Sequence, residues 1–245
     1  MLKKISSLKF SGNGPIKILY PGLSFSNEDT GIGSIGRIDH AYINTNTTIP
    51  MHPHVNDEIL SYFRTGLVEH SDSEGSVKVI GKNRLMLMKA GRRFYHEEKV
   101  MGEQEALEAL QIFIRPGKKD LRPEVTFLDL TDIHSENKWR LLASPTSQTA
   151  FHFSSETWIY DMKLLRNTVM GLPELLRNNL TVILYLFKGS VLIDGHIALA
   201  KRDALIITGQ QIIIEARDED AELVLFVTDE QAEIYKGGMY SGRRA

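Results

Sequence analysis

Short stretches of hydrophobic residues, separated by glycine, asparagine and aspartate, run along most of the chain. Such stretches between turn-forming residues are typical of β-strands. Many of them are hydrophobic throughout instead of alternating, which indicates strands that are covered on both faces. The pattern therefore predicts an all-β protein built from sandwich-like barrels. The clearest predicted strands are 77–80, 85–88, 182–187, 191–193, 204–207, 211–215 and 222–227.

Two segments depart from this pattern. Residues 103–109 combine high helix propensity with hydrophobic positions at helical spacing, so we expect a helix there, followed by a strand through Ile114. The segment 172–180 fits either a short helix or an irregular connection.

The two halves of the chain resemble each other. Residues 59–66 match residues 183–189, and residues 84–91 match residues 202–209. A repeat of this kind predicts two copies of one β-unit, each of roughly 120 residues. The link between them is the proline-rich and charged segment 116–123, which divides the chain into domains 1–118 and 119–245.

Composition narrows the classes of function. The 245 residues carry 29 basic and 31 acidic side chains, with a net charge of −2. Nucleic acids and anionic membranes select basic surfaces, so we expect neither as a partner. The chain has no cysteine, which excludes disulfides, thiolate-bound metals and thiol catalysis. It also has no stretch typical of a signal peptide or a transmembrane helix, and we expect a cytoplasmic protein.

Two pairs of polar residues suggest a metal site. His52 and His54 are two residues apart, so on a strand both point to the same face, and Pro53 between them favours extended backbone. His96 and Glu98 form a second pair of the same kind. Three imidazoles and one carboxylate suit one divalent transition metal, whether Fe, Mn, Ni, Cu or Zn. The alternative is that all four are surface residues at strand ends.

The repeat offers an internal comparison for these four positions. Aligned as above, their counterparts in the second half are Leu175, Arg177, Ile214 and Ala216. One copy keeps all four polar groups and the other keeps none. We therefore predict one metal-binding unit and one degenerate unit.

The motifs of the first half resemble those of a known family. They are His52-Pro53-His54, Glu58, Gly66, His70, Asp72, Ser73 and Gly75, followed by Met88, Ala90, Gly91, His96 and Glu98. Their order and spacing resemble the first cupin of the pirin-like bicupins, and residues 184–209 resemble the second, metal-free cupin of that family. The resemblance spans nearly the whole chain.

This resemblance implies two antiparallel β-barrel domains and one non-haem metal, with iron as the favoured ion, at His52, His54, His96 and Glu98. It also leaves two functions open. The first is a dioxygenase that acts with O₂ on a flavonol-like aromatic molecule. The second is a non-enzymatic, redox-responsive binding protein whose partner is another protein.

Further residues near these motifs are candidates for a role at the site. Glu58 is a candidate catalytic base, or else a solvated carboxylate at a strand end. Arg93 and Val55 stand where the family often has glycine and arginine, and we expect them to alter the lining of the pocket. His70 falls in a sequence typical of a turn, and we expect a turn residue there.

The remaining histidines and the C-terminal tail are assigned no chemistry. His40 precedes a predicted strand, and His134, His152 and His196 are expected on the surface. The glycine-rich segment 236–245 is expected to be loose.

Overall fold

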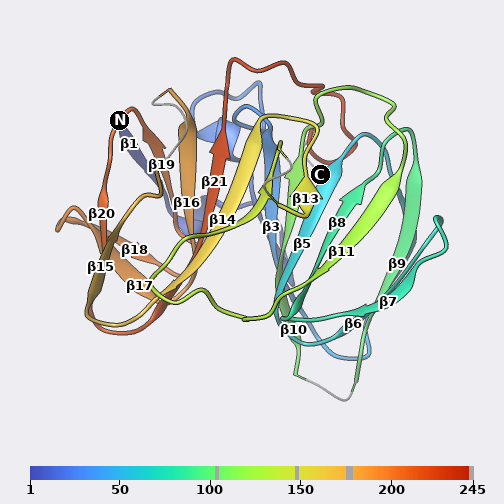
Figure 1. Ribbon diagram of the computed structural model, residues 1–245, viewed down its shortest axis with the longest axis horizontal. Helices are drawn as coiled ribbons and strands as arrows, with labels where there is room; N and C mark the ends of the chain where they lie inside the picture. The colour runs from blue at the N-terminus through green and yellow to red at the C-terminus, as the bar shows by residue number, and fades with distance from the viewer. Residues whose placement is uncertain (103–104, 147–148, 175–178, 243–245) are drawn as a thin grey trace. The chain divides into compact units, whose positions relative to one another are not determined.

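Figure 1 shows a computed structural model of the chain, which describes residues 1–102, 105–146, 149–174 and 179–242. Nearly all of its regular structure is β-strand, which confirms the predicted all-β fold class. The helices among these residues are two short 3-10 turns, η1 (Ser7–Lys9) and η2 (Pro21–Ser24). In this part of the chain no helix is both long enough and apolar enough to cross a bilayer.

The chain divides into two compact units, and each end of the chain belongs to the unit formed mainly by the opposite half of the sequence. The N-terminal unit consists of Phe10–Ile133, Phe153–Ser155 and Ala232–Ala245. The C-terminal unit consists of Met1–Lys9, His134–His152 and Glu156–Gln231. The expected division between residues 118 and 119 does not include this exchange, in which β1 near the N-terminus pairs with β19 and the C-terminal segment belongs to the N-terminal unit.

The N-terminal unit contains two antiparallel sheets, with the strand orders β11-β8-β5-β10-β3-β2 and β4-β9-β6-β7 (Figure 1). Phe63, Val68, Met86 and Val100 are fully buried in its main core. The strands are β2 (Ile16–Leu19), β3 (Ile35–Ile43), β4 (Thr48–His54), β5 (Glu58–Thr65), β6 (Val68–Asp72), β7 (Val77–Ile80), β8 (Arg84–Lys89), β9 (Phe94–Val100), β10 (Leu107–Ile114) and β11 (Glu124–Asp129).

The C-terminal unit repeats this plan, with the strand orders β1-β19-β16-β21-β14-β12-β13 and β15-β20-β17-β18. Its first strand comes from the N-terminus of the chain and pairs with β19. The strands are β1 (Leu2–Ile5), β12 (Arg140–Ser144), β13 (Phe151–His152), β14 (Thr157–Leu164), β15 (Thr168–Gly171), β16 (Thr181–Lys188), β17 (Ser190–Ile193), β18 (Ile197–Ala200), β19 (Ala204–Thr208), β20 (Ile213–Ala216) and β21 (Ala221–Thr228).

Matching turns support the internal repeat. Gly66 and its counterpart Gly189 have φ angles of 75° and 83°, and Gly91 and Gly209 have φ angles of 52° and 66°. Side chains are disfavoured in this left-handed region, so glycine is kept at the same turns in both units. At Gly91 a Cβ atom would also lie 2.0 Å from the carbonyl oxygen of Leu121.

The helix expected over residues 103–109 is wrong where the structure describes it. Strand β10 begins at Leu107 and pairs with both β3 and β5, so residues 107–109 belong to a central strand. Buried Leu107 and Ala109 flank a more exposed Glu108, and pairing on both sides outweighs helix propensity. Residues 103–104 lie outside the described residues. So do residues 175–178, which include Leu175 and Arg177.

Residues 236–242 of the tail are held in place, contrary to the expectation that this segment is loose, and residues 243–245 lie outside the described residues. Arg115, only 1% exposed, donates hydrogen bonds to the carbonyl oxygens of Ser241 (3.1 Å) and Gly33 (3.2 Å). It also pairs with Asp29 at 2.5 Å. Burial alone would raise the pKa of Asp29, but hydrogen bonds from Arg115 and Lys236 hold it well below its ordinary value. One buried guanidinium thus joins the end of β10 to the tail.

We expect Arg115→Met to lower the free energy of unfolding of the N-terminal unit by about 1–3 kcal/mol, because it leaves the carbonyl groups of Ser241 and Gly33 without their donor and removes one of the two cations beside Asp29. Urea denaturation measures this change. The control is Arg84→Met, which removes an exposed ion pair with Asp129 and should have little effect. Equal losses in the two variants would contradict the role given to Arg115.

Candidate metal centre

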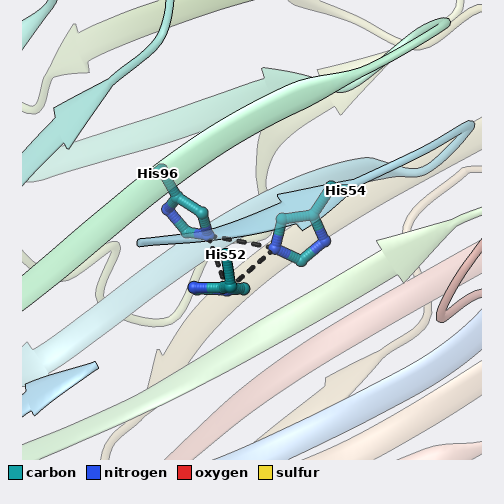
Figure 2. Close-up of side chains that lie close together, drawn as sticks. All are labelled: His52, His54 and His96. Carbon is teal, nitrogen blue, oxygen red and sulfur yellow. Dashed lines mark hydrogen bonds between the residues drawn. The ribbon is translucent and has the colours of Figure 1, made fainter. Parts of the chain in front are cut away.

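The register between β4 and β9 places the histidines. The two strands are antiparallel, His52 lies opposite His96, and His54 follows two residues later on β4. A bulge between Ile49 and His52 shifts the register just before this point. Figure 2 shows the three imidazole rings, from β4 and β9, pointing toward one another. The predicted same-face pairing of His52 and His54 therefore produces a cluster with His96.

The three Nε2 atoms form a small, nearly equilateral triangle. The His54–His52 and His96–His52 distances are both 3.1 Å, and the His54–His96 distance is 3.0 Å. Burial, followed by the neighbouring imidazoles of His54, His52 and His70, lowers the pKa of His96 to about 2. Burial also lowers the pKa of His52. Protonation of His52 and His96 is thus disfavoured, so the Nε2 lone pairs of these two rings are available to a metal ion.

The size and chemistry of this triangle fit a transition-metal ion. Ligands at right angles on one ion, each about 2.1 Å from it, lie about 3 Å apart. The tautomer of His52 also fits, because its Nδ1–H donates to the carbonyl oxygen of Pro50 at 2.9 Å. That bond leaves Nε2 without a proton, as a metal ligand requires.

Glu98 adjoins the triangle. It is 3% exposed, and its Oε1 lies 3.8 Å from His96 Nδ1 and accepts a hydrogen bond from Gln111 Nε2 at 3.3 Å. Burial raises the pKa of Glu98 to about 7, although the Gln111 bond opposes this shift. A nearby cation would stabilise the buried carboxylate. The structure groups potential ligand atoms as His52–His54–His96 and, separately, as His70–His96–Glu98.

His70 is not the turn residue expected from the sequence. It lies within β6, is fully buried, and its Nε2 is 2.8 Å from Asp72 Oδ2. Its ring centroid is 5.4 Å from that of His96. Strand β6 continues through Asp72, so the polar turn begins only after that residue. The signal for its position was present, since His70 and Asp72 are two residues apart and share a face.

Glu58, the candidate base, is placed apart from the histidines. It is 1% exposed and accepts a hydrogen bond at 3.0 Å from the backbone N–H of Ser154. Burial raises its pKa and the bonds from Ser154 oppose the shift. Ile59 lines the cavity beside the histidines and Glu58 does not. Adjacent residues on a strand face opposite sides, so the structure does not bring Glu58 to the candidate metal centre.

The other residues considered also lie outside the cavity lining. Arg93 is exposed, with its guanidinium 6.0 Å from the ring of Tyr95. Val55 contributes a backbone carbonyl that accepts a hydrogen bond from the N–H of Met239 at 2.9 Å. His40 is buried, and its Nε2 lies 2.9 Å from Glu108 Oε1. His134 is half-buried, and His152 and His196 are exposed.

A cavity of about 250 Å³ opens beside the three histidines. Six of its lining residues are hydrophobic or aromatic and seven carry polar or ionisable side chains, so the cavity offers both apolar walls and hydrogen-bonding groups to a small molecule. The lining residues are Ile16, Arg37, Asp39, Ile49, His52, His54, Ile59, Met88, His96, Glu98, Gln111, Phe113 and Tyr240.

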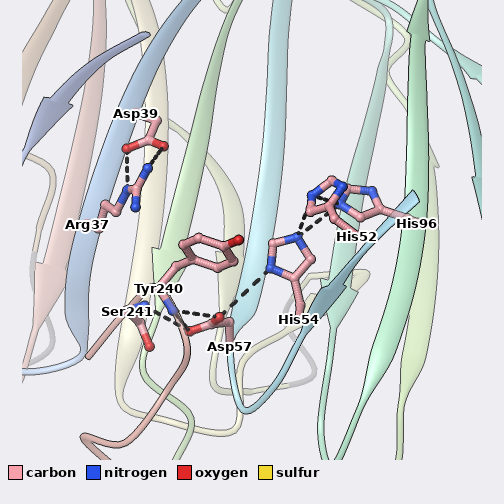
Figure 3. Close-up of polar contacts among 8 residues, drawn as sticks. All are labelled: Arg37, Asp39, His52, His54, Asp57, His96, Tyr240 and Ser241. Atoms are coloured by element: carbon pink, nitrogen blue, oxygen red, sulfur yellow. Dashed lines mark hydrogen bonds and ion pairs between the residues drawn. The ribbon is translucent and has the colours of Figure 1, made fainter. Parts of the chain in front are cut away.

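The tail supplies part of this site, which sequence reasoning missed. Tyr240 lies with its ring centroid 5.0 Å from His54 and 5.6 Å from Phe113. The buried carboxylate of Asp57 accepts hydrogen bonds from the backbone N–H groups of Tyr240 (3.0 Å) and Ser241 (2.8 Å). Its Oδ2 is also 3.9 Å from His54 Nδ1 (Figure 3). Asp57 therefore holds the tail by hydrogen bonds and lies beside a candidate ligand, too far from His54 Nδ1 for a hydrogen bond.

The C-terminal unit has apolar side chains at the corresponding strands. Ile214 and Ala216, the predicted counterparts of His96 and Glu98, are fully buried in its core. In the β15–β20 ladder the residue opposite Ile214 is Met170, which packs against the same core. By this register Met170 takes the position of His52, so the predicted counterpart Leu175 was wrong by five residues. Hydrophobic packing in this unit replaces the polar cluster of the other.

Comparison with known proteins places this site in context. Residues 24–114 match the family model described as Pirin. A putative quercetin 2,3-dioxygenase of Pasteurella multocida is 27% identical over 178 residues, covering 72% of this chain and 74% of that protein. The quercetin 2,3-dioxygenase of Escherichia coli K12 is 26% identical over 197 residues, covering 80% and 83%. The crystal structure of the E. coli bacterial pirin YhhW in complex with nickel(II) superposes with a TM-score of 0.77 at 22% identity, covering 93% and 99%.

We expect His96→Ala to lose bound metal, because it removes one corner of the Nε2 triangle. Elemental analysis after loading with Ni(II) and gel filtration measures the metal content of each chain. The exposed His196, in the C-terminal unit, provides the control variant His196→Ala, which should retain the wild-type content. Equal metal content in the two variants would rule out the triangle as the binding site.

The position of Asp57 leads to a second expectation. Asp57→Asn should weaken metal affinity by about tenfold, because it removes a buried negative charge 3.9 Å from His54 Nδ1 that would stabilise a cation bound by that ring. Competition with a chelator gives the dissociation constant. Asp129→Asn, at an exposed ion pair on β11, is the control. An unchanged affinity in Asp57→Asn would show that this carboxylate serves only the tail.

Proposed function

We propose that this chain, which belongs to the pirin-like cupin family, binds one divalent transition metal through His52, His54 and His96, with Glu98 as a fourth ligand. The observation that carries the proposal is the triangle of Nε2 atoms, each 3.0–3.1 Å from the other two. Buried Glu98, beside His96, would complete a set of three imidazoles and one carboxylate. Such a set suits several first-row metals. Iron stays the ion predicted from the family resemblance.

The cavity beside this set supports an enzymatic role. We propose that it admits a flavonol-like aromatic molecule and O₂, as the names of the quercetin 2,3-dioxygenase relatives suggest. A bound metal supplies a Lewis acid that holds a substrate hydroxyl and lowers its pKa. Ile49, Ile59 and Phe113 provide apolar walls for a planar ring system and limit the access of water.

A second candidate function is a redox-responsive binding protein. The observation that favours it is the connection from His54 through Asp57 to the backbone of Tyr240 and Ser241. A redox-active metal held by the three histidines would gain one unit of positive charge on one-electron oxidation by an external oxidant such as O₂, at a mostly buried site. A change in the position of His54 would then reach the tail and alter a surface that a protein partner could contact.

Oxygen uptake distinguishes these two functions. Metal-loaded protein should consume O₂ in the presence of quercetin, and His52→Ala should reduce this uptake to background. His152→Ala, which changes an exposed histidine on β13, should behave as the wild type.

Absence of uptake by protein loaded with Fe(II), Mn(II) or Ni(II) would contradict the enzymatic role. In that case the binding-protein function predicts that trypsin cleaves after Lys236 at different rates in the Fe(II) and Fe(III) forms. Equal rates of cleavage would contradict that function as well.

A further inference from the structure

Arg37 and Asp39 line the same cavity as the histidines, and neither is part of the proposed metal centre. Both side chains lie on β3, two residues apart, and therefore on the same face of the strand. The Arg37 side chain is 7% exposed and that of Asp39 is 6% exposed. In Figure 3 the ring of Tyr240 lies between this pair and the histidines.

The pair uses only part of the guanidinium. Arg37 Nε donates to Asp39 Oδ1 at 2.6 Å, and Arg37 Nη2 donates to Asp39 Oδ2 at 2.5 Å. The third nitrogen, Nη1, is buried and has no hydrogen-bond partner among the described residues. A buried N–H without an acceptor is costly, so such groups in native proteins call for an explanation.

Aromatic rings hold the guanidinium in place. Its central carbon lies 5.1 Å from the ring centroid of Phe113, 5.4 Å from that of Tyr240 and 5.9 Å from that of Tyr20. Rings attract a cation but are only weak hydrogen-bond acceptors. The surroundings therefore fix the position of Nη1 without supplying the oxygen it lacks, and a ligand in the cavity could supply that oxygen.

The charge of the pair indicates what kind of oxygen fits. Asp39 already balances the positive charge of Arg37, so the pair offers a hydrogen-bond donor without a net charge. A carboxylate ligand would gain little here, because it would also lie close to the Asp39 carboxylate. A hydroxyl group suits the pair better, since it can accept from Nη1 and donate to a remaining lone pair of Asp39.

We propose that Arg37 and Asp39 form a hydroxyl-recognition subsite in the cavity beside the histidines, an inference that rests on the proposed function. One end of the aromatic ligand directs its oxygens at the histidines. The subsite selects ligands that carry a further hydroxyl group at the other end. Arg37 and Asp39 are thus specificity-determining residues, and the C-terminal Tyr240 forms one wall between the two ends of the ligand.

Two flavonols test this subsite on the Ni(II)-loaded protein. Quercetin and 3-hydroxyflavone share the same hydroxy-ketone, but 3-hydroxyflavone has no other hydroxyl group. Wild-type protein should bind quercetin at least about tenfold more tightly, as measured by fluorescence titration. Arg37→Lys keeps a charge for Asp39 and removes Nη1, so it should abolish most of this preference while leaving the affinity for 3-hydroxyflavone within about twofold.

A double variant tests the pair as a whole, and a matched double variant at an exposed pair is its control. Arg37→Met with Asp39→Leu removes the whole pair without stranding a charge and should give the same loss of preference. The same substitutions at Arg84 and Asp129, an exposed pair with two similar hydrogen bonds, should leave the preference unchanged. Nickel content confirms that each variant retains its metal centre.

Three results would overturn the inference in distinguishable ways. A quercetin preference that persists in Arg37→Lys would exclude the subsite while leaving the proposed function intact. If 3-hydroxyflavone-4′-carboxylate binds more tightly than quercetin, and this binding depends on Arg37, the subsite prefers an anion and not a hydroxyl group. Failure of metal-loaded wild-type protein to bind either flavonol would overturn the flavonol function, and the subsite with it.

Discussion

The antiparallel register of β4 and β9 is the constraint on which the candidate metal centre depends. It sets His52 opposite His96 and leaves His54 two residues further along, so that three Nε2 atoms meet within 3.1 Å. A slip of one residue would turn His52 and His54 to the opposite face of the sheet. Burial lowers the pKa of His96 to about 2, so this ring stays unprotonated. A metal cation is the species that three converging imidazole nitrogens in this arrangement would bind.

The rest of the N-terminal unit supports this cluster through its tail. Arg115 anchors the carbonyl group of Ser241, and Asp57 accepts hydrogen bonds from the N–H groups of Tyr240 and Ser241. Both are buried charged side chains that bind backbone groups, and they place the ring of Tyr240 against His54. A segment at the end of the chain therefore completes a wall of a cavity whose other residues come from the first half of the sequence. In the C-terminal unit the corresponding strands carry Met170 and Ile214, which extend the hydrophobic core instead.

Much of this could be predicted from the sequence. Strand-forming patterns gave the fold class, and the spacing of His52 and His54 gave a shared face, because both depend on local backbone geometry. The strand at Leu107 was mistaken for a helix, since its pairing with β3 and β5 outweighs local propensity. Asp57 and Tyr240 could not be found, because the contact between them joins residues far apart in the sequence. Glu58 was selected because it belongs to the motif that resembles the pirin-like family, whereas the pleat of β5 directs Ile59 into the cavity.

X-ray absorption spectroscopy of the Ni(II)-loaded protein tests the central claim most directly, because multiple scattering from imidazole rings counts the histidines on the metal. We expect three imidazole ligands, with the remaining scatterers at short range being oxygen, and we expect His96→Ala to lose this signal together with its metal. A spectrum with no more than one imidazole, or a metal bound equally well without His96, would contradict a centre formed by His52, His54 and His96.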